Sequence, residues 1–123
     1  MSLSERVANR LATDGEFRLA SRYWTGRIIL RLPAATISLS LVEGAVSAQD
    51  DLRPGPVLTL SGSGEVWERL LADVPPPGFN DLVPARLQGL EMEGDEETLW
   101  QYYPALRRLI DVLREEGVRD AAV

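Results

Sequence analysis

Hydrophobic residues recur along the chain with two different periods, which separate expected helices from expected strands. Three apolar residues at four-residue intervals predict an N-terminal helix over residues 2–14: Leu3, Val7 and Leu11. Ser2 and Glu5 form the pattern of a capping box at its start. Asp14-Gly15 predicts its end, since glycine adopts the left-handed conformation that terminates helices.

From Phe17 onward, apolar and polar residues alternate, as in a strand with one buried face. This pattern predicts a strand from Phe17 to Leu32 with a bulge or bend at Gly26. A clearer strand follows over residues 36–41. Glu43-Gly44 predicts a tight turn into a short strand at Ala45–Ala48, residues 49–56 predict a loop, and residues 57–60 predict a further short strand.

The second half of the chain alternates between helix and strand patterns. Ser63 is the expected N-cap of a helix with Trp67, Leu70, Leu71 and Val74 on its apolar face, ended by Pro75-Pro76-Pro77-Gly78. Residues 79–87 predict a short helix broken at Pro84, and residues 90–93 a short strand. The strongest periodicity predicts one last helix from Asp95 to Gly117, disturbed near Trp100 by Pro104: Leu99, Tyr103, Leu106, Ile110 and Leu113.

This order of elements predicts an α+β fold: a roughly five-stranded, mostly antiparallel sheet covered on one face by helices. The 123 residues correspond to one domain, residues 1–123, with a core over about residues 17–113 and a frayed tail at 117–123.

The amino-acid composition excludes several kinds of catalytic and metal site, because three residue types are absent. The chain contains no Cys, no His and no Lys, and all 13 basic residues are Arg. Disulfides, thiolate nucleophiles, Cys/His zinc sites, a Ser-His-Asp triad within the chain and lysine Schiff bases are therefore excluded. We expect no cofactor and no metal.

The charge argues about partners and location. Nineteen acidic residues give a net charge of −6, whereas nucleic-acid binders carry a basic face, so we expect no nucleic-acid partner. No apolar run approaches the roughly 20 residues of a transmembrane helix, and the first residues lack the pattern of a signal peptide. We expect a cytoplasmic monomer or homodimer.

Two polar patterns favour structural roles over chemistry. Residues 61–64 precede a helix, as phosphate-binding loops do, but Trp67 occupies the position of the third glycine and no lysine follows. The acidic groups at Asp50-Asp51 and from Glu93 to Glu97 lie in an expected loop and at a helix start, where they cap and solvate.

Six aromatic residues lie beside the expected apolar faces: Trp24, Trp67, Phe79, Trp100, Tyr102 and Tyr103. They predict either an aromatic core or the lining of a slot between the sheet and the last helix. A kink at Pro104 would open one end of such a slot.

The chain from about Phe17 to Leu113 resembles the sterol carrier protein type 2 lipid-binding family, in a divergent bacterial branch. The resemblance rests on Leu58-Thr59-Leu60-Ser61 leading to a helix, on Gly89 to Asp95 preceding the closing helix, and on the Glu43-Gly44 turn. Further similar stretches are Arg22 to Gly26, Val74 to Pro77 and Tyr102-Tyr103-Pro104.

The resemblance implies a non-catalytic carrier with a tunnel for a sterol, fatty acid or other lipid between sheet and helices. Its expected lining consists of Trp24, Trp67, Leu71, Phe79, Leu99, Tyr103, Leu106 and Ile110. Two alternatives stay open. One is a small isomerase, cyclase or hydrolase that uses Asp, Glu and Tyr in an apolar pocket, with Asp81 as the acid to mutate first. The other is an accessory domain of a partner enzyme.

Overall fold

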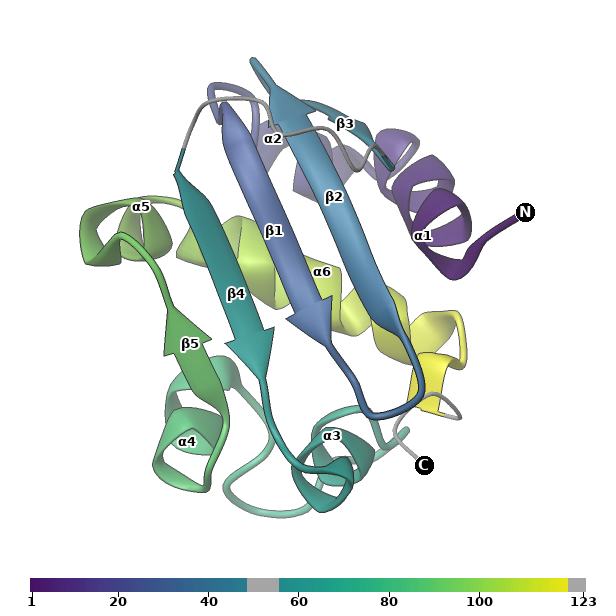
Figure 1. The fold of residues 1–123 in the computed structure, drawn as a ribbon, viewed down its shortest axis with the longest axis vertical. Helices are drawn as coiled ribbons and strands as arrows, with labels where there is room; N and C mark the ends of the chain where they lie inside the picture. Colours follow the sequence, from purple (N-terminus) through teal and green to yellow (C-terminus); the bar gives the residue numbers. More distant parts are fainter. Residues whose placement is uncertain (49–55, 120–123) are drawn as a thin grey trace.

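A five-stranded sheet with helices packed behind it forms the protein (Figure 1). The structure is a computed structural model that describes residues 1–48 and 56–119. In chain order its elements are α1 (Leu3–Ala12), α2 (Gly15–Ala20), β1 (Gly26–Arg31), β2 (Thr36–Val42), β3 (Ala45–Ser47), β4 (Val57–Ser61), α3 (Gly64–Leu70), α4 (Leu82–Leu87), β5 (Glu91–Glu93), α5 (Glu96–Gln101) and α6 (Tyr103–Glu115).

The strands lie in the order β3-β2-β1-β4-β5. The central pair, β1 and β4, is parallel, with Ile28 opposite Leu58, and the other three pairs are antiparallel. The α+β class and the mostly antiparallel sheet are therefore confirmed. Glu43 and Gly44 form the predicted turn between β2 and β3, both with positive φ, the geometry that a two-residue hairpin requires.

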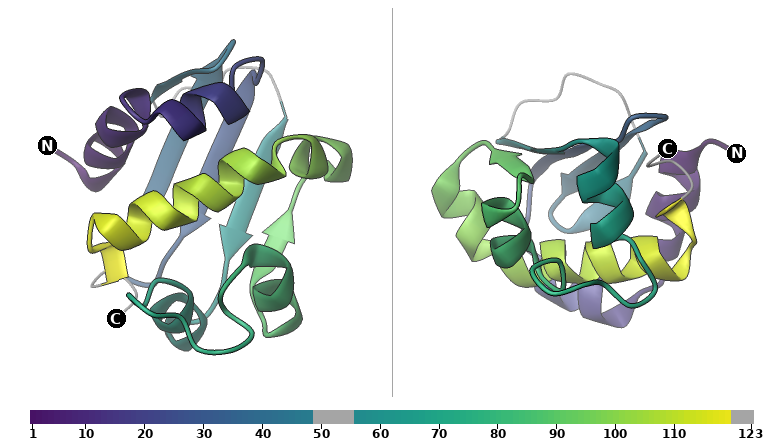
Figure 2. Two further views of the ribbon diagram at one scale, coloured as in Figure 1. Left: turned by 180° about the vertical axis from the view of Figure 1, so that it is seen from behind. Right: turned by 90° about the horizontal axis from the view of Figure 1, so that it is seen from below.

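The strands alternate between a buried and a more open face, and the buried face is the one that the helices cover. Figure 2 shows α6 crossing the back of the sheet, with α1 and α2 beside it. Fully or nearly fully buried residues from both layers form one core, among them Ile28, Leu30, Leu39, Leu58, Leu60, Leu106, Leu109 and Leu113.

Three predicted helix caps are confirmed. The side chains of Ser2, Ser63 and Asp95 each accept a hydrogen bond from the backbone N–H three residues later, at the starts of α1, α3 and α5. Each bond satisfies an N–H that has no partner within its helix.

The predicted strand from Phe17 to Tyr23 is wrong, because this segment forms α2 and the turn after it. Asp14 does not only end α1. Its carboxylate accepts from the Phe17 N–H at 2.9 Å and so starts a new helix. Phe17 and Ser21, one helical turn apart, are both fully buried, while Leu19 and Tyr23 are exposed. The alternation was therefore coincidental, and the strand begins only at Gly26.

The last helix is two helices. Pro104 has no N–H and its ring clashes with the carbonyl four residues earlier, so α5 ends at Gln101 and Pro104 lies in the first turn of α6. By contrast, Pro84 does not break α4. It lies in the first turn, where its missing N–H would have no helical partner.

Two predicted boundaries shift, and a third lies almost wholly outside the described residues. The helix expected to reach Val74 ends at Leu70, and Val74 is 85% exposed. The expected tail from Gly117 includes Val118, which packs in the core. The predicted loop over residues 49–56 falls outside the described residues except for Pro56.

Candidate functional site

The eight residues expected to line a tunnel all lie in or against the hydrophobic core, here called the apolar layer. Seven of them are at most 4% exposed, and Tyr103 packs against the core at its edge. They come from the segment just before β1 (Trp24), from α3 and its end (Trp67, Leu71), from the segment before α4 (Phe79), from α5 (Leu99) and from α6 (Tyr103, Leu106, Ile110).

The two tryptophans of this set mark opposite ends of β1. Trp24 precedes the first residue of the strand, and the Trp67 indole N–H donates to the carbonyl of its last residue, Arg31, at 2.8 Å. Six strand residues rise by about 3.3 Å each, so the β1 backbone spans roughly 17 Å from its first to its last residue. The candidate residues are therefore spread along the length of β1.

Trp24 is the polar exception within this apolar layer. Its ring lies parallel to the Tyr102 ring, with the centroids 4.6 Å apart. Its Nε1 is buried and has no hydrogen-bond partner among the described residues. An unsatisfied buried donor costs about 1–3 kcal/mol, so a ligand oxygen at this atom would be stabilised. Tyr102 was missing from the expected lining, because only the break before α6 turns its ring toward Trp24.

Asp81, the acid singled out for an enzyme, is bound by its neighbours. Its Oδ1 accepts from its own helix at Leu82 N (2.7 Å) and from the Tyr103 hydroxyl (2.9 Å), and it pairs with Arg107 at 3.3 Å. Burial, above all, raises the pKa of the Tyr103 hydroxyl, which keeps it protonated as a donor. The adjoining cavity has a volume of about 40 Å³, room for little more than a water molecule.

The acids near α5 also have structural partners. Hydrogen bonds from Thr98 lower the pKa of Asp95, and the bond from Arg86 lowers the pKa of Glu96. Both stay charged as a helix cap and an ion-pair partner. The described part of the chain contains no cluster of three or more potential metal ligands. Asp50-Asp51 lies outside the described residues.

A buried ion pair that the sequence did not predict joins the N-terminal helices to α6. Arg108 donates to both oxygens of Asp14, at 2.7 and 2.9 Å, and Asp14 is 7% exposed. The hydrogen bonds from Arg108 hold the pKa of the Asp14 carboxyl well below its usual range. The partners are 94 residues apart, so no local pattern could have revealed them.

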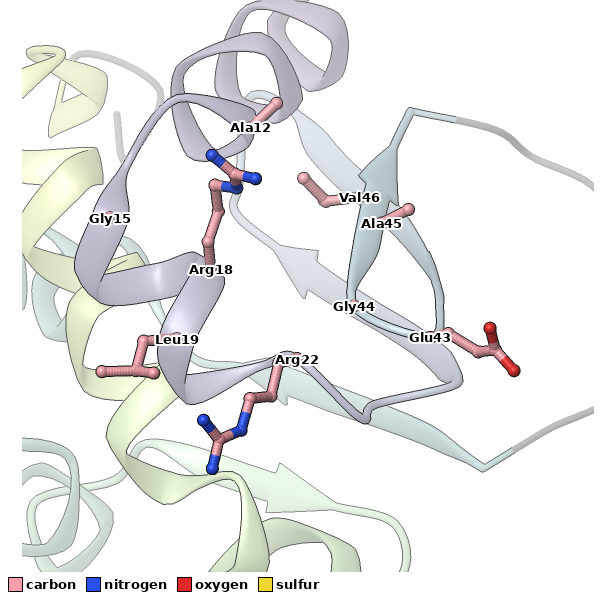
Figure 3. Close-up of a pocket in the computed structure, with 9 residues that line it drawn as sticks. All are labelled: Ala12, Gly15, Arg18, Leu19, Arg22, Glu43, Gly44, Ala45 and Val46. Atoms are coloured by element: carbon pink, nitrogen blue, oxygen red, sulfur yellow. The ribbon is translucent and has the colours of Figure 1, made fainter.

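A surface cleft of about 770 Å³ lies between α2 and the β2–β3 turn (Figure 3). The Arg18 side chain extends along it beside Ala12, while the Glu43 carboxylate points away from it. Gly15, Arg18 and Leu19 of α2 line this cleft. The sequence analysis did not predict the cleft, because it assigned residues 17–20 to a strand. None of the eight candidate residues lines this cleft. One of them, Ile110, borders the small cavity beside Asp81.

Two solved structures share this architecture. The crystal structure of sterol carrier protein 2 aligns with a TM-score of 0.65 and 20% identity, over 91% of this chain and 93% of that one. The solution structure of a conserved hypothetical protein from Thermus thermophilus, suggested to be a sterol carrier protein, aligns with a TM-score of 0.59 and 21% identity, over 91% and 84% of the two chains. The sequence matches no family model and no curated protein.

The chain therefore has the sterol-carrier-protein-like fold, as its resemblance to that family implied. Within the described residues, the structure contains no helix with the length and apolar content to cross a membrane.

Proposed function

We propose that this chain is a non-catalytic carrier of an elongated apolar ligand, such as a sterol, a fatty acid or another lipid. The observation that carries the proposal is the fold likeness to sterol carrier protein 2 over nine-tenths of both chains. The ligand would lie between the sheet and α6, against the eight candidate residues.

The chemistry of this layer supports an apolar ligand. Leu71, Leu99, Leu106 and Ile110 offer aliphatic surface, and Trp24, Trp67 and Phe79 offer aromatic surface, with fractional exposures of 0–4%. Removing apolar ligand surface from water provides about 25 cal/mol per Å². The free N–H of Trp24 would donate to one hydroxyl, carbonyl or carboxylate oxygen at one end of the ligand.

The polar groups support a carrier more than an enzyme. Asp81, Asp95 and Glu96 are held by helix caps and arginine partners. A general acid works best with a pKa near the operating pH, whereas hydrogen bonds lower the pKa of Asp95 and Glu96. We propose that these groups hold helices in place while the apolar layer contains the ligand.

Lipid binding is tested by native mass spectrometry of the purified protein and by titration with two fluorescent probes, cis-parinaric acid and dehydroergosterol. We expect saturable 1:1 binding of at least one probe with energy transfer from tryptophan. A protein that carries no lipid and binds neither probe would overturn the proposal.

A matched pair of variants locates the ligand. Trp24→Phe keeps an aromatic ring but removes the N–H. Because both probes carry an oxygen that could accept from this N–H, we expect the variant to weaken severalfold the binding of whichever probe binds. Trp100→Phe makes the same change at a residue that is 51% exposed, and its affinity should be unchanged. Equal affinities in both variants would place the ligand away from Trp24.

A further inference from the structure

Residues 71–81 cover one end of the apolar layer between the end of α3 and the start of α4, and we call them the cover segment. Figure 2 shows this loop beside α3 and α4 at the end of the sheet. The segment places Phe79 in the core at 4% exposure, while Val74 is 85% exposed. One side of the segment thus faces solvent, and the other packs against the core.

One arginine of α6 bonds to the cover segment and to the last residue of α3, just before the segment begins. The Arg114 side chain donates from Nε to the Leu70 carbonyl at 2.8 Å and from Nη2 to the Phe79 carbonyl at 3.3 Å. Its Nη1 pairs with Asp111 at 2.9 Å. Arg114 is thereby held in place on α6 while it binds two carbonyls that lie nine residues apart in the chain.

The backbone of the segment makes few other bonds. Three successive prolines remove three N–H donors and stiffen the chain. Among the described residues, the remaining backbone bonds within 72–79 are local, from Ala72 to Arg69 and from Phe79 to Pro76. The segment is therefore stiff, but no ladder of hydrogen bonds ties it to the sheet.

Cavities flank the segment on both sides. One of about 490 Å³ is lined by Ala72, Val74 and Pro76 together with Glu65 and Arg69 of α3. The other, of about 40 Å³, lies between Asn80 and Asp81 and the α6 residues, and it reaches Ile110 of the candidate lining. The segment thus has free space beside it, and its far edge meets the apolar layer.

We infer that the cover segment is a movable cover over the apolar layer and that Phe79 occupies, in the closed state, the space that an entering ligand takes. This inference rests on the proposed function. Opening exchanges the Arg114 bond to the Phe79 carbonyl for bonds to water. This bond is charge-assisted, but its rupture leaves no buried charge without a partner, because the released acceptor is a neutral carbonyl. Exposure of Phe79 opposes opening and returns the cover to its closed position.

Thiol labelling tests the opening directly. The chain has no cysteine, so a single introduced cysteine provides the only thiol that a maleimide can modify. The chain has two phenylalanines, and both are buried: Phe79 under the cover segment and Phe17 in α2. We expect the Phe79→Cys thiol to react with a maleimide at least about tenfold faster than the Phe17→Cys thiol without denaturant. Equal rates with equal urea dependence would show that only global unfolding exposes residue 79, and would overturn the inference.

Arg114→Met tests the clasp that holds the cover closed. We expect it to accelerate labelling at position 79 by about tenfold and to leave labelling at position 17 unchanged. Arg6→Met is the matched control, because Arg6 also donates to a backbone carbonyl, that of Glu116, but away from the cover segment. Equal acceleration by both variants would contradict the role of Arg114.

Amide hydrogen exchange of the wild-type protein measures the same opening without a cysteine, and it replaces thiol labelling if a cysteine variant fails to fold. The amide of Phe79 is bonded to Pro76 and that of Phe17 to Asp14. We expect the Phe79 amide to exchange through a local opening, with a weaker denaturant dependence than the Phe17 amide. Identical denaturant dependence of the two amides would overturn the inference.

Uptake of cis-parinaric acid links the cover to ligand entry. We expect Arg114→Met to raise the association rate by a factor similar to its effect on labelling at position 79. Faster labelling with an unchanged association rate would overturn the assignment of the cover as the entry route. A protein that labels rapidly at position 79 but binds neither probe would overturn the proposed function and not the motion of the cover.

Discussion

Two arginines of α6, six residues apart, hold different parts of the molecule by different chemistry. Arg108 bonds to both oxygens of the buried Asp14 carboxylate and so holds the junction of α1 and α2. Arg114 bonds to two neutral backbone carbonyls and so holds the cover segment. At about 100° per residue, the two side chains leave the helix about 120° apart.

The two regions differ in the free-energy cost of breaking the bonds that their arginine makes. Breaking the Arg108–Asp14 pair would leave two opposite charges partly buried, which is strongly unfavourable. Breaking the Arg114 bonds releases carbonyls that water satisfies. The N-terminal helices are therefore fixed in place, whereas the cover segment can open at modest cost.

The largest effect should come from removing the Asp14 carboxylate. Asp14→Ala leaves Arg108 without its partner and deprives α2 of its cap, so we expect a loss of about 3 kcal/mol in the free energy of unfolding. Urea denaturation measures it. Asp14→Asn keeps an oxygen for the Phe17 N–H and should lose less. A loss below about 1 kcal/mol for Asp14→Ala would contradict the picture of a fixed junction.

The same pair predicts a dependence on pH. Because Arg108 holds the pKa of the folded Asp14 carboxyl below its usual value, the unfolded chain takes up the proton first, near about pH 4. The stabilisation is fully present above about pH 5 and is lost as the pH falls further. The stability difference between the wild type and Asp14→Asn should therefore shrink from about pH 6 to about pH 3. A constant difference would show that charge does not hold this junction.

A smaller effect is expected on the other side of α6. Arg114→Met keeps most of the apolar stem but removes the charge-assisted bonds to Leu70 and Phe79, and we expect it to lower stability by about 2 kcal/mol. Combined with Asp14→Ala, the losses should add within about 0.5 kcal/mol, because the two sites share no partner. Strong coupling in the double variant would mean that the two regions open together.

The smallest effect should come from removing the Tyr103 hydroxyl, which also contacts the cover segment at Asp81. Tyr103→Phe keeps the ring but removes the hydroxyl that donates to Asp81 and accepts from Val83 N–H, so we expect a loss of about 0.5–1 kcal/mol. Labelling at position 79 should accelerate less than in Arg114→Met. A larger acceleration than that of Arg114→Met would make Tyr103, and not Arg114, the main clasp.

Local patterns predicted the elements that local physics decides. The caps at Ser2, Ser63 and Asp95 and the turn at Glu43-Gly44 depend on residues at most three positions apart, and all were predicted correctly. The segment after Asp14 was not. Its alternation fits a strand, but the Asp14 cap and the burial of Phe17 and Ser21 against other elements make it helical.

The candidate site divides in the same way. The sequence indicated eight apolar or aromatic residues beside the expected core. The structure buries seven of them in one core and packs Tyr103 against it, and their role as a ligand lining stays a prediction. The sequence held no sign that Tyr102 stacks on Trp24 or that Arg114 reaches Leu70, because these partners are 78 and 44 residues apart.

The sequence by itself determined the class of fold and the apolar character of its interior, since periodicity and the absence of Cys, His and Lys are properties of the chain. Only the tertiary structure decided how the interior is closed. Pro104 separates α5 from α6, and the helical geometry of α6 directs Arg108 toward Asp14 and Arg114 toward the cover segment. The reason is physical: burial and hydrogen bonding between distant residues depend on how the layers pack, which no local pattern encodes.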